Sequence, residues 1–355
     1  MSDLFKHKTM QNVSDIIKWY KKKFRDLPWR TTHNPYQIWL AEVILQQTQI
    51  VQGLDYYHKF VSEFPDIASL AAADEEYVLK LWQGLGYYSR ARNMLKTARI
   101  IIDEYQGFFP PNKQKLMALP GIGDYTSSAI LSFSFNLPFP TLDGNVFRVL
   151  ARYYNIDEPI DKPQTRKLFL EILQPMIQAA DPRTFNNAMM ELGATICKPD
   201  KPKCEICPLS VDCQARILNK IKFLPVKSLK AIKRKRFFNY LYISHKDSFF
   251  ISKRTEKDIW VNLFELPLIE TAEKTDFGDL LPMIKEKYPL LTIQNIAQQV
   301  SFKHILTHQV LDIQFWSIEI KHLDNFVSEN CLMVDKESYT KYPLPVPINK
   351  FLLSL

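Results

Sequence analysis

The sequence has no long hydrophobic run. Nowhere in its 355 residues does an uninterrupted apolar stretch approach the roughly 20 residues of a membrane-spanning helix. The segment from Met1 to Phe24 also lacks the apolar centre of a secretory signal peptide. Repeats and low-complexity tracts are missing as well. With 46% hydrophobic residues to fill its cores, the sequence predicts a folded protein of the cytoplasm.

Cysteine is scarce, with five residues, but four of them lie close together with the spacing C-x6-C-x2-C-x5-C: Cys197, Cys204, Cys207 and Cys213. In a reducing compartment this grouping predicts a metal site rather than disulfides. Four thiolates can hold tetrahedral zinc or a [4Fe–4S] cluster, and the number of ligands does not separate the two. The distant first cysteine favours iron–sulfur, since zinc sites more often use two close pairs. Cys331 stands alone and is predicted to be a small buried side chain.

Acidic residues are outnumbered by basic ones, which gives a formal charge of +8 and an isoelectric point near 9.0. This balance favours a polyanionic partner such as nucleic acid over a neutral one. The densest cationic run, KIKFLPVKSLKAIKRKR, ends at Arg236. We expect it to be a solvated linker over residues 216–236 rather than a dedicated phosphate contact.

Hydrophobic periodicity divides the chain. From about residue 10 to 215, apolar residues recur at spacings of three and four, which predicts a mainly α-helical region. After the linker, FNYLYISHKDSFFISKR reads as two strands around a turn at His245, Lys246 and Asp247. We therefore expect a smaller mixed α/β domain from Phe237 to the C-terminus.

A glycine-containing turn opens a helix in LPGIGDYTSSAIL, residues 119–131. Gly121 and Gly123 let the backbone approach a ligand, and the first free N–H groups of the helix would point at it. Because the helical stretch NKQKLMA comes before it, the segment predicts a helix, hairpin and helix unit that holds a DNA phosphate. The alternative is a turn with a purely structural role.

Two acids lie where more than one interpretation is possible. Asp143 in LDGNVFRVLARYY precedes a helix, so it is either an N-cap or a carboxylate held ionised beside a developing cation. Glu42 flanks the apolar face of a helix that starts with Asn34 as N-cap, Pro35 as first residue and Gln37 completing a capping box. Poor solvation there would raise its pKa above the reference of about 4.3, as a general acid requires. The alternative is a salt-bridged or surface acid.

Five segments together resemble one family. WLAEVILQQTQ, LWQGLGYYSRARN, LPGIGDYTSSAI, LDGNVFRVLAR and the cysteine loop follow in this order between about residues 10 and 215. They closely resemble the adenine DNA glycosylases (MutY type) of the helix-hairpin-helix, endonuclease III superfamily. The resemblance implies a helical catalytic region with a six-helix module over about 30–135 and an iron–sulfur module from 1–29 and 136–215. Residues 237–355 resemble more weakly the family's C-terminal Nudix-like α/β domain for lesion recognition.

The resemblance implies an activity. Such enzymes remove adenine mispaired with 8-oxoguanine or guanine by hydrolysing the N-glycosidic bond, after the base has been flipped into the cleft between the two modules. Glu42 would protonate the adenine and later handle water, while Asp143 would stay ionised and stabilise, or transiently trap, the sugar cation. Tyr125 and Asn145 match positions that support these acids. Because bifunctional relatives carry a lysine at the position of Tyr125, the enzyme is expected to be monofunctional.

Further positions carry over by the same resemblance. The four clustered cysteines would hold a [4Fe–4S] cluster, and Gly121 and Gly123 would bind phosphate. The adenine pocket would be lined by Arg25, Trp29, Arg30, Leu45 and Asn187. Gln47 and Thr48 would replace the flipped base, and Tyr87 would wedge the opposite strand. Thr307 and His308 would contact 8-oxoguanine. For the neighbouring Tyr88, packing in the helical core is the alternative.

Two features depart from the family. The family's Phe-Ser-His loop is here Leu306-Thr307-His308, so a hydroxyl remains but the aromatic wedge is gone. Residues 268–290 lack the G-x5-E-x7-R-E-x-x-E-E pattern of Nudix hydrolases, so no pyrophosphohydrolase activity is expected.

Two other functions fit part of the pattern. An endonuclease III-like glycosylase and lyase for oxidised pyrimidines would share the helical region and the cluster, although Tyr125 and the second domain argue against it. In a non-catalytic iron–sulfur DNA-binding module, Glu42 and Asp143 would be structural. In the preferred interpretation a monomer binds double-stranded DNA in the bacterial cytoplasm at the nucleoid, with replication or mismatch-repair proteins as further partners.

Overall fold

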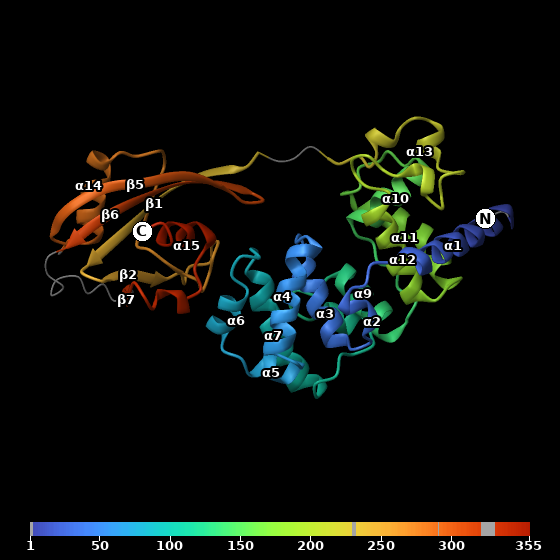
Figure 1. Cartoon of the computed structure of the whole chain (residues 1–355), viewed down its shortest axis with the longest axis horizontal. Coiled ribbons are helices and arrows are strands. Elements are labelled where there is room, and N and C mark those ends of the chain that lie inside the picture. The colour runs from blue at the N-terminus through green and yellow to red at the C-terminus, as the bar shows by residue number, and fades with distance from the viewer. Residues whose placement is uncertain (1–2, 229–231, 290, 321–330) are drawn as a thin grey trace. The chain divides into compact units, whose positions relative to one another are not determined.

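The computed structural model describes residues 3–228, 232–289, 291–320 and 331–355 (Figure 1). The chain divides into two compact units. The first, the helical unit, comprises Met1–Ala72 and Asn93–Leu229. The second, the sheet unit, comprises Ala73–Arg92 and Lys230–Leu355. Across the described residues no helix combines the length and the apolarity needed to cross a membrane.

Helices make up the regular structure described for the helical unit. In chain order they are α1 (Asp3–Lys23), α2 (Pro28–Thr31), α3 (Pro35–Leu45), α4 (Ile50–Glu63), α5 (Ile67–Ala72), α7 (Ser89–Tyr105), which starts in the sheet unit, α8 (Lys113–Met117), α9 (Asp124–Phe135), α10 (Gly144–Tyr154), α11 (Pro163–Gln178), α12 (Pro182–Thr195), η1 (Cys204–Ile206), α13 (Gln214–Ile217) and η2 (Ile221–Phe223). The predicted helical character of this part of the chain is confirmed.

Capping residues place the helices that carry the acids. The Asn34 side chain accepts the Tyr36 N–H at 2.9 Å, and Pro35 is the first residue of α3, as predicted. The capping box is wrong, because the Asn34 N–H donates to Thr32 Oγ1 at 3.1 Å instead of to Gln37. Asp143 is the N-cap of α10.

Helix α3 lies in the core of the helical unit. All of its residues from Ile38 to Ile44 are buried, Glu42 included. Ile38 packs with Ala129 and Phe133 of α9, and a larger apolar cluster joins α1, α10, α11 and α12. These two packed groups set the positions of the acid in α3 and of the acid before α10.

A tight turn joins α8 to α9, as the sequence predicts. Gly121 has a φ of +77°, and a Cβ there would lie 2.9 Å from the Cβ of Asn93. The position therefore needs glycine both for its backbone angle and for space. Gly123 has extended backbone and is the N-cap of α9.

The sheet unit is a mixed α/β fold, as predicted. Its elements are α6 (Glu75–Leu81), β1 (Arg234–His245), β2 (Ser248–Lys253), β3 (Phe264–Glu265), β4 (Leu268–Thr271), α14 (Phe277–Lys287), β5 (Ile293–Ile305), β6 (Gln309–Ile320), β7 (Cys331–Asp335), η3 (Tyr339–Lys341) and α15 (Val346–Leu352). The strand order is β3-β2-β1-β6-β5, with β4 paired to β1 and β7 to β2. β1 and β6 run parallel, with Arg234 opposite Gln309.

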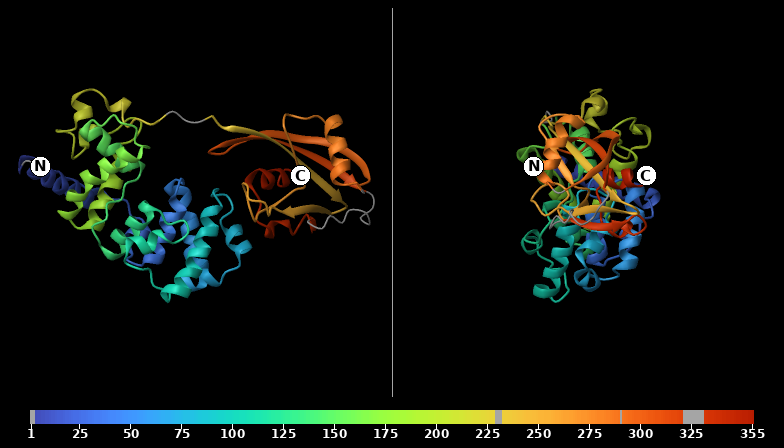
Figure 2. Two further views of the ribbon diagram at one scale, coloured as in Figure 1. Left: turned by 180° about the vertical axis from the view of Figure 1, so that it is seen from behind. Right: turned by 90° about the vertical axis from the view of Figure 1, so that its left-hand side faces the viewer.

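The sheet is covered on both faces. Helix α15 lies against one face and α14 against the other (Figure 2). Successive residues of β1 point to opposite sides, so Tyr240 packs in a core with Phe351 of α15, while Leu241 packs with Leu280 of α14. The predicted hairpin around Lys246 is present, with His245 opposite Ser248.

The basic run is only partly a linker. Strand β1 begins at Arg234, inside the predicted linker of residues 216–236. Arg236 has only 8% of its surface exposed. The predicted solvation is therefore wrong at Arg236, which enters the sheet where β1 pairs with β6, whereas Arg234 and Lys235 are exposed as predicted.

Candidate active site

The helical unit encloses a cavity of about 340 Å³. Glu42 from α3 and Asp143 from the start of α10 both line it. So do all the residues that the sequence assigned to the support of these acids, to the adenine pocket and to the replacement of the flipped base: Arg25, Trp29, Arg30, Leu45, Gln47, Thr48, Tyr125, Asn145 and Asn187. The fold thus gathers at one cavity side chains that are far apart in the sequence.

Glu42 is held in a poorly solvated position. Only 7% of its surface is exposed, and the Tyr125 hydroxyl hydrogen-bonds to its carboxyl group. Burial raises the pKa of Glu42 to about 7, and the nearby Asp143 carboxylate adds to the rise. The Tyr125 hydrogen bond and the Arg30 cation oppose it. A carboxyl group with this pKa can donate a proton at neutral pH.

Asp143 has a different environment. Its Oδ1 accepts the N–H groups of Asn145 at 3.0 Å and Val146 at 2.8 Å, and its Oδ2 accepts the Asn145 side-chain amide at 2.7 Å. Burial raises the pKa of Asp143, while these donors and the Arg148 guanidinium lower it. The pKa of Asp143 remains above its ordinary value, but its three N–H donors interact with the ionised form, and among the described residues Glu42 has no such set of N–H donors.

Tyr125 on α9 presents a phenol to both acids. Burial and the neighbouring carboxyl groups of Glu42 and Asp143 raise its pKa well above the ordinary value. The phenol therefore stays neutral and can donate its proton in a hydrogen bond. It cannot act as an amine nucleophile.

Arg148, which the sequence analysis did not single out, fixes Asn145. Its Nη2 donates to Asn145 Oδ1 and to the Gly193 carbonyl, both at 2.8 Å, and its Nε donates to the Cys197 carbonyl at 2.7 Å. This orients the Asn145 amide so that its nitrogen points at Asp143. The sequence does indicate this contact, since Arg148 lies one helical turn beyond Asn145 in LDGNVFRVLAR.

Glu191 on α12 was also missed. It is fully buried and accepts Arg25 at 2.7 and 2.8 Å and Arg30 at 2.6 Å. The two arginines at the cavity wall are therefore held by one carboxylate. Nothing in the local pattern reveals this, because Glu191 is more than one hundred and sixty residues from Arg30 in the chain.

The four clustered cysteines surround one pocket, together with Arg152 and Arg216. Among the described residues no three histidine, cysteine or acidic side chains are grouped closely enough to hold a single metal ion. Four thiols around one pocket are the ligand set of a tetrahedral zinc ion or of a [4Fe–4S] cluster. Arg152 Nη1 lies 3.5 Å from Cys197 Sγ and also donates to the Lys198 carbonyl at 2.7 Å.

The sheet unit contains a second pocket, of about 530 Å³. Tyr87, Thr307 and His308, all predicted to contact DNA, line it. The hydroxyl groups of Tyr87 and Thr307 hydrogen-bond to each other. Tyr87 is 45% exposed whereas Tyr88 is 4% exposed, so the core position belongs to Tyr88.

Comparisons with known families agree with this arrangement. A family model described as HhH-GPD superfamily base excision DNA repair protein matches residues 40–175. A NUDIX domain model matches residues 239–354. Among solved structures, a thermostable thymine-DNA glycosylase is 29% identical, with a TM-score of 0.55 over 60% of this chain and 98% of that one. An endonuclease III–DNA complex is 21% identical, with a TM-score of 0.52 over 62% of this chain and 99% of that one, which shows the shared fold.

Curated relatives match over most of the chain. An adenine DNA glycosylase of Buchnera aphidicola subsp. Acyrthosiphon pisum is 36% identical over 340 residues, which is 95% of both chains. One of Buchnera aphidicola subsp. Baizongia pistaciae is 36% identical over 98% of this chain and 97% of the relative. The mouse adenine DNA glycosylase is 39% identical over 57% of this chain and 41% of its own. The chain therefore belongs to the adenine DNA glycosylase family, the hydrolases that remove adenine from DNA in base excision repair.

Proposed function

We propose that this glycosylase acts on adenine opposite 8-oxoguanine or guanine and that it hydrolyses the N-glycosidic bond with Glu42 as acid and Asp143 as stabilising carboxylate. The observation that carries the proposal is that both acids line one cavity, where Asp143 accepts three N–H donors and Glu42 has, in the part of the chain that the structure describes, only the Tyr125 hydroxyl. Two carboxyl groups that differ in protonation are what cleavage of a glycosidic bond requires.

The adenine enters the cavity after leaving the base stack, because its glycosidic bond is out of reach in the duplex. Trp29 and Leu45 offer apolar surface to the base, while Arg30 and Asn187 offer polar groups. Gln47 and its neighbour Thr48 then occupy the space that the base leaves in the duplex.

Glu42 transfers its proton to the purine, which makes the base a better leaving group. As the bond breaks, positive charge develops on the sugar, and the Asp143 carboxylate stabilises or transiently traps it. The ionised Glu42 then accepts a proton from the attacking water. Tyr125 and Asn145 hold the two carboxyl groups in these roles.

The reaction is monofunctional. The described lining of the cavity includes arginine but no lysine, and Tyr125 takes the place of the lyase lysine. No amine is therefore available to form a Schiff base with the sugar.

The four clustered cysteines would hold a [4Fe–4S] cluster, which supplies a structural centre for the loop around them. Lys198, Lys201 and Lys203 on this loop are exposed and would contact phosphates, as would the turn at Gly121 and Gly123. Analysis of the purified protein should find about four iron and four sulfide per chain. Zinc without sulfide would contradict the cluster.

The second pocket would read the base opposite the adenine, with Tyr87 as wedge and Thr307 and His308 as contacts. Under this proposal residues 237–355 serve lesion recognition, and the protein acts as a monomer on double-stranded DNA of the nucleoid. Its further protein partners and its lack of pyrophosphohydrolase activity stay predictions.

One assay tests the proposal. The purified protein is incubated with duplexes containing A:8-oxoguanine or A:G, and free adenine and strand nicking are measured. We expect adenine release without nicking before alkali, and loss of release in Glu42→Gln. Glu63→Gln, an exposed acid at the end of α4, is the control. Release that persists in Glu42→Gln would contradict the acid role, nicking would favour the lyase, and binding without release would favour the non-catalytic module.

A further inference from the structure

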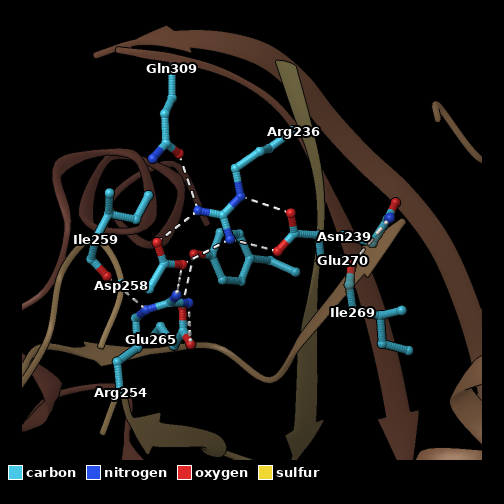
Figure 3. Close-up of polar contacts among 10 residues, drawn as sticks. Arg236, Asn239, Arg254, Asp258, Ile259, Glu265, Ile269, Glu270 and Gln309 are labelled. Atoms are coloured by element: carbon cyan, nitrogen blue, oxygen red, sulfur yellow. Dashed lines mark hydrogen bonds and ion pairs between the residues drawn. The ribbon is translucent and has the colours of Figure 1, made fainter. Parts of the chain in front are cut away.

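A partly buried network of ion pairs crosses one end of the sheet unit (Figure 3). It contains two guanidinium groups, Arg236 and Arg254, and three carboxyl groups, Asp258, Glu265 and Glu270. Both arginine side chains are nearly inaccessible to solvent. None of these residues belongs to the active-site cavity in the helical unit.

Arg236 on β1 is the centre of the network. It donates to Glu270 at 2.6 and 2.7 Å and to Asp258 at 2.8 and 2.9 Å, and its fifth N–H reaches Gln309 Oε1 at 3.1 Å. All five N–H groups of the guanidinium therefore have acceptors. The planar fork fixes the three acceptor side chains relative to one another.

Arg254 extends the network on the side of Asp258. Its Nη2 donates to Asp258 Oδ2 at 2.9 Å, and its Nε donates to the Ile259 carbonyl at 3.1 Å. Its Nη1 binds Glu265, which also accepts the Tyr240 hydroxyl at 2.9 Å. The segment that starts at Asp258 is thus held by both arginines.

The network joins two walls of the second pocket. Asp258, Ile259 and Trp260 form one wall, and residues 305–309 form another. Arg236 contacts the first wall through Asp258 and the second through Gln309. Its position therefore sets the separation of the two walls.

Lys233, just before β1, and Arg234, its first residue, also hold the turn between β5 and β6. The Lys233 ammonium donates to the Leu306 carbonyl at 2.8 Å, and the Arg234 N–H donates to the His308 carbonyl at 3.0 Å. Together with the contact of Arg236 with Gln309, these hydrogen bonds hold the turn on both sides of Thr307. The C-terminal end of the basic run, Lys233 to Arg236, therefore fixes the position of this turn.

Stability alone is a weak reason for such a network, because desolvation offsets much of the attraction between buried charges. A guanidinium group whose five N–H groups all have acceptors holds those acceptor side chains in fixed relative positions. The geometry points to Arg236 as a positioning residue that, through Asp258 and Gln309, fixes the turn between β5 and β6 relative to the facing wall of the pocket. Because this turn carries Thr307 and His308, Arg236 thereby sets the discrimination between 8-oxoguanine and guanine opposite the adenine. This rests on the proposed role of the second pocket.

The test compares single-turnover excision and duplex affinity on A:8-oxoguanine and on A:G. Gln309→Ala removes the contact of Arg236 with the turn but also trims the pocket wall, so Arg236→Lys, which keeps the charge, loses the fork and leaves the pocket lining intact, is tested beside it. We expect both variants to lower the preference for A:8-oxoguanine by about tenfold, the effect of one charge-assisted hydrogen bond. Tyr240→Phe, which removes a bond at the far end of the network, is the matched control and should keep the preference.

Thr307→Ala and His308→Ala separate the two proposals. If they lower the preference while Gln309→Ala and Arg236→Lys leave it unchanged, the positioning role is refuted and the role of the pocket stands. If no variant changes the preference, the pocket does not read the opposite base and both proposals fail. An equal loss in Tyr240→Phe would show general loosening and would also refute the positioning role.

Discussion

Glu42 and Asp143 show how the surroundings of a side chain decide its chemistry. The two carboxyl groups share a cavity, and burial raises the pKa of both. Asp143 accepts three N–H donors at a helix N-terminus, whereas Glu42 has one hydroxyl group from Tyr125. The N–H donors around Asp143 stabilise its ionised form, and the proposed assignment of Glu42 as the acid depends on this difference.

The pH dependence of excision follows from this. With a pKa of about 7, Glu42 carries its proton below neutral pH and loses it as the pH rises. We expect the single-turnover rate on A:8-oxoguanine to fall on the alkaline side with a midpoint near 7. Rates measured from about pH 5 to about pH 9 test this. A rate that rises through neutrality would contradict the assignment of Glu42 as acid.

The raised pKa of Glu42 also predicts a cost in stability. The folded chain binds this proton with a pKa of about 7, against an ordinary value of 4.5, so stability is lost as the pH rises through this interval. Above it the loss is on the order of 3 kcal/mol. Glu42→Gln should therefore unfold at a higher temperature than the parent at about pH 8, with the difference vanishing at acidic pH.

Thermal unfolding at several pH values measures this difference. Glu63→Gln, which removes an exposed acid at the end of α4, is the control. If the unfolding temperatures of the parent and of Glu42→Gln changed with pH in parallel, burial of the ionised Glu42 would not destabilise the folded protein.

At the scale of elements, the packing of α10 against α12 sets the position of Asp143. Gly193 of α12 touches α10 so closely that a Cβ there would lie 2.6 Å from the Cβ of Asn145 and 2.7 Å from its carbonyl oxygen. The same helix carries Glu191, which holds Arg25 and Arg30. Helix α12 thus supports two walls of the active-site cavity.

Gly193→Ala should therefore displace Asn145 and the carboxylate it holds. We expect the single-turnover excision rate to fall by about a hundredfold, since small misplacements of reacting groups have effects of this size. Thermal unfolding checks that Gly193→Ala stays folded, and Gly144→Ala, whose added methyl meets no atom within 4 Å but faces the cavity, is compared with it in unfolding only. Unchanged excision in Gly193→Ala would mean that the contact between these helices does not position Asp143.

At the scale of the whole molecule, the positive charge of +8 predicts how DNA binding responds to salt. The logarithm of the binding constant should fall linearly with the logarithm of salt concentration, with a slope of roughly 0.9 per neutralised phosphate. Replacing Lys198, Lys201 and Lys203 by alanine should reduce the slope by roughly 0.9 for each phosphate that these lysines neutralise. Filter binding or fluorescence anisotropy at several salt concentrations measures the slope. An unchanged slope would place the phosphate-binding residues elsewhere.

The sequence by itself determined the helical and α/β parts of the chain, the turn at Gly121, the N-cap Asp143 and the grouping of four cysteines. Each of these depends on residues that are neighbours along the chain, so spacing reveals them. The tertiary structure alone decided that Glu191 holds two arginines, that Arg148 orients Asn145, and that Arg236 enters the sheet instead of a solvated linker. The physical reason is that burial and charge pairing bring together residues far apart in the chain, and no local pattern records which partners will meet.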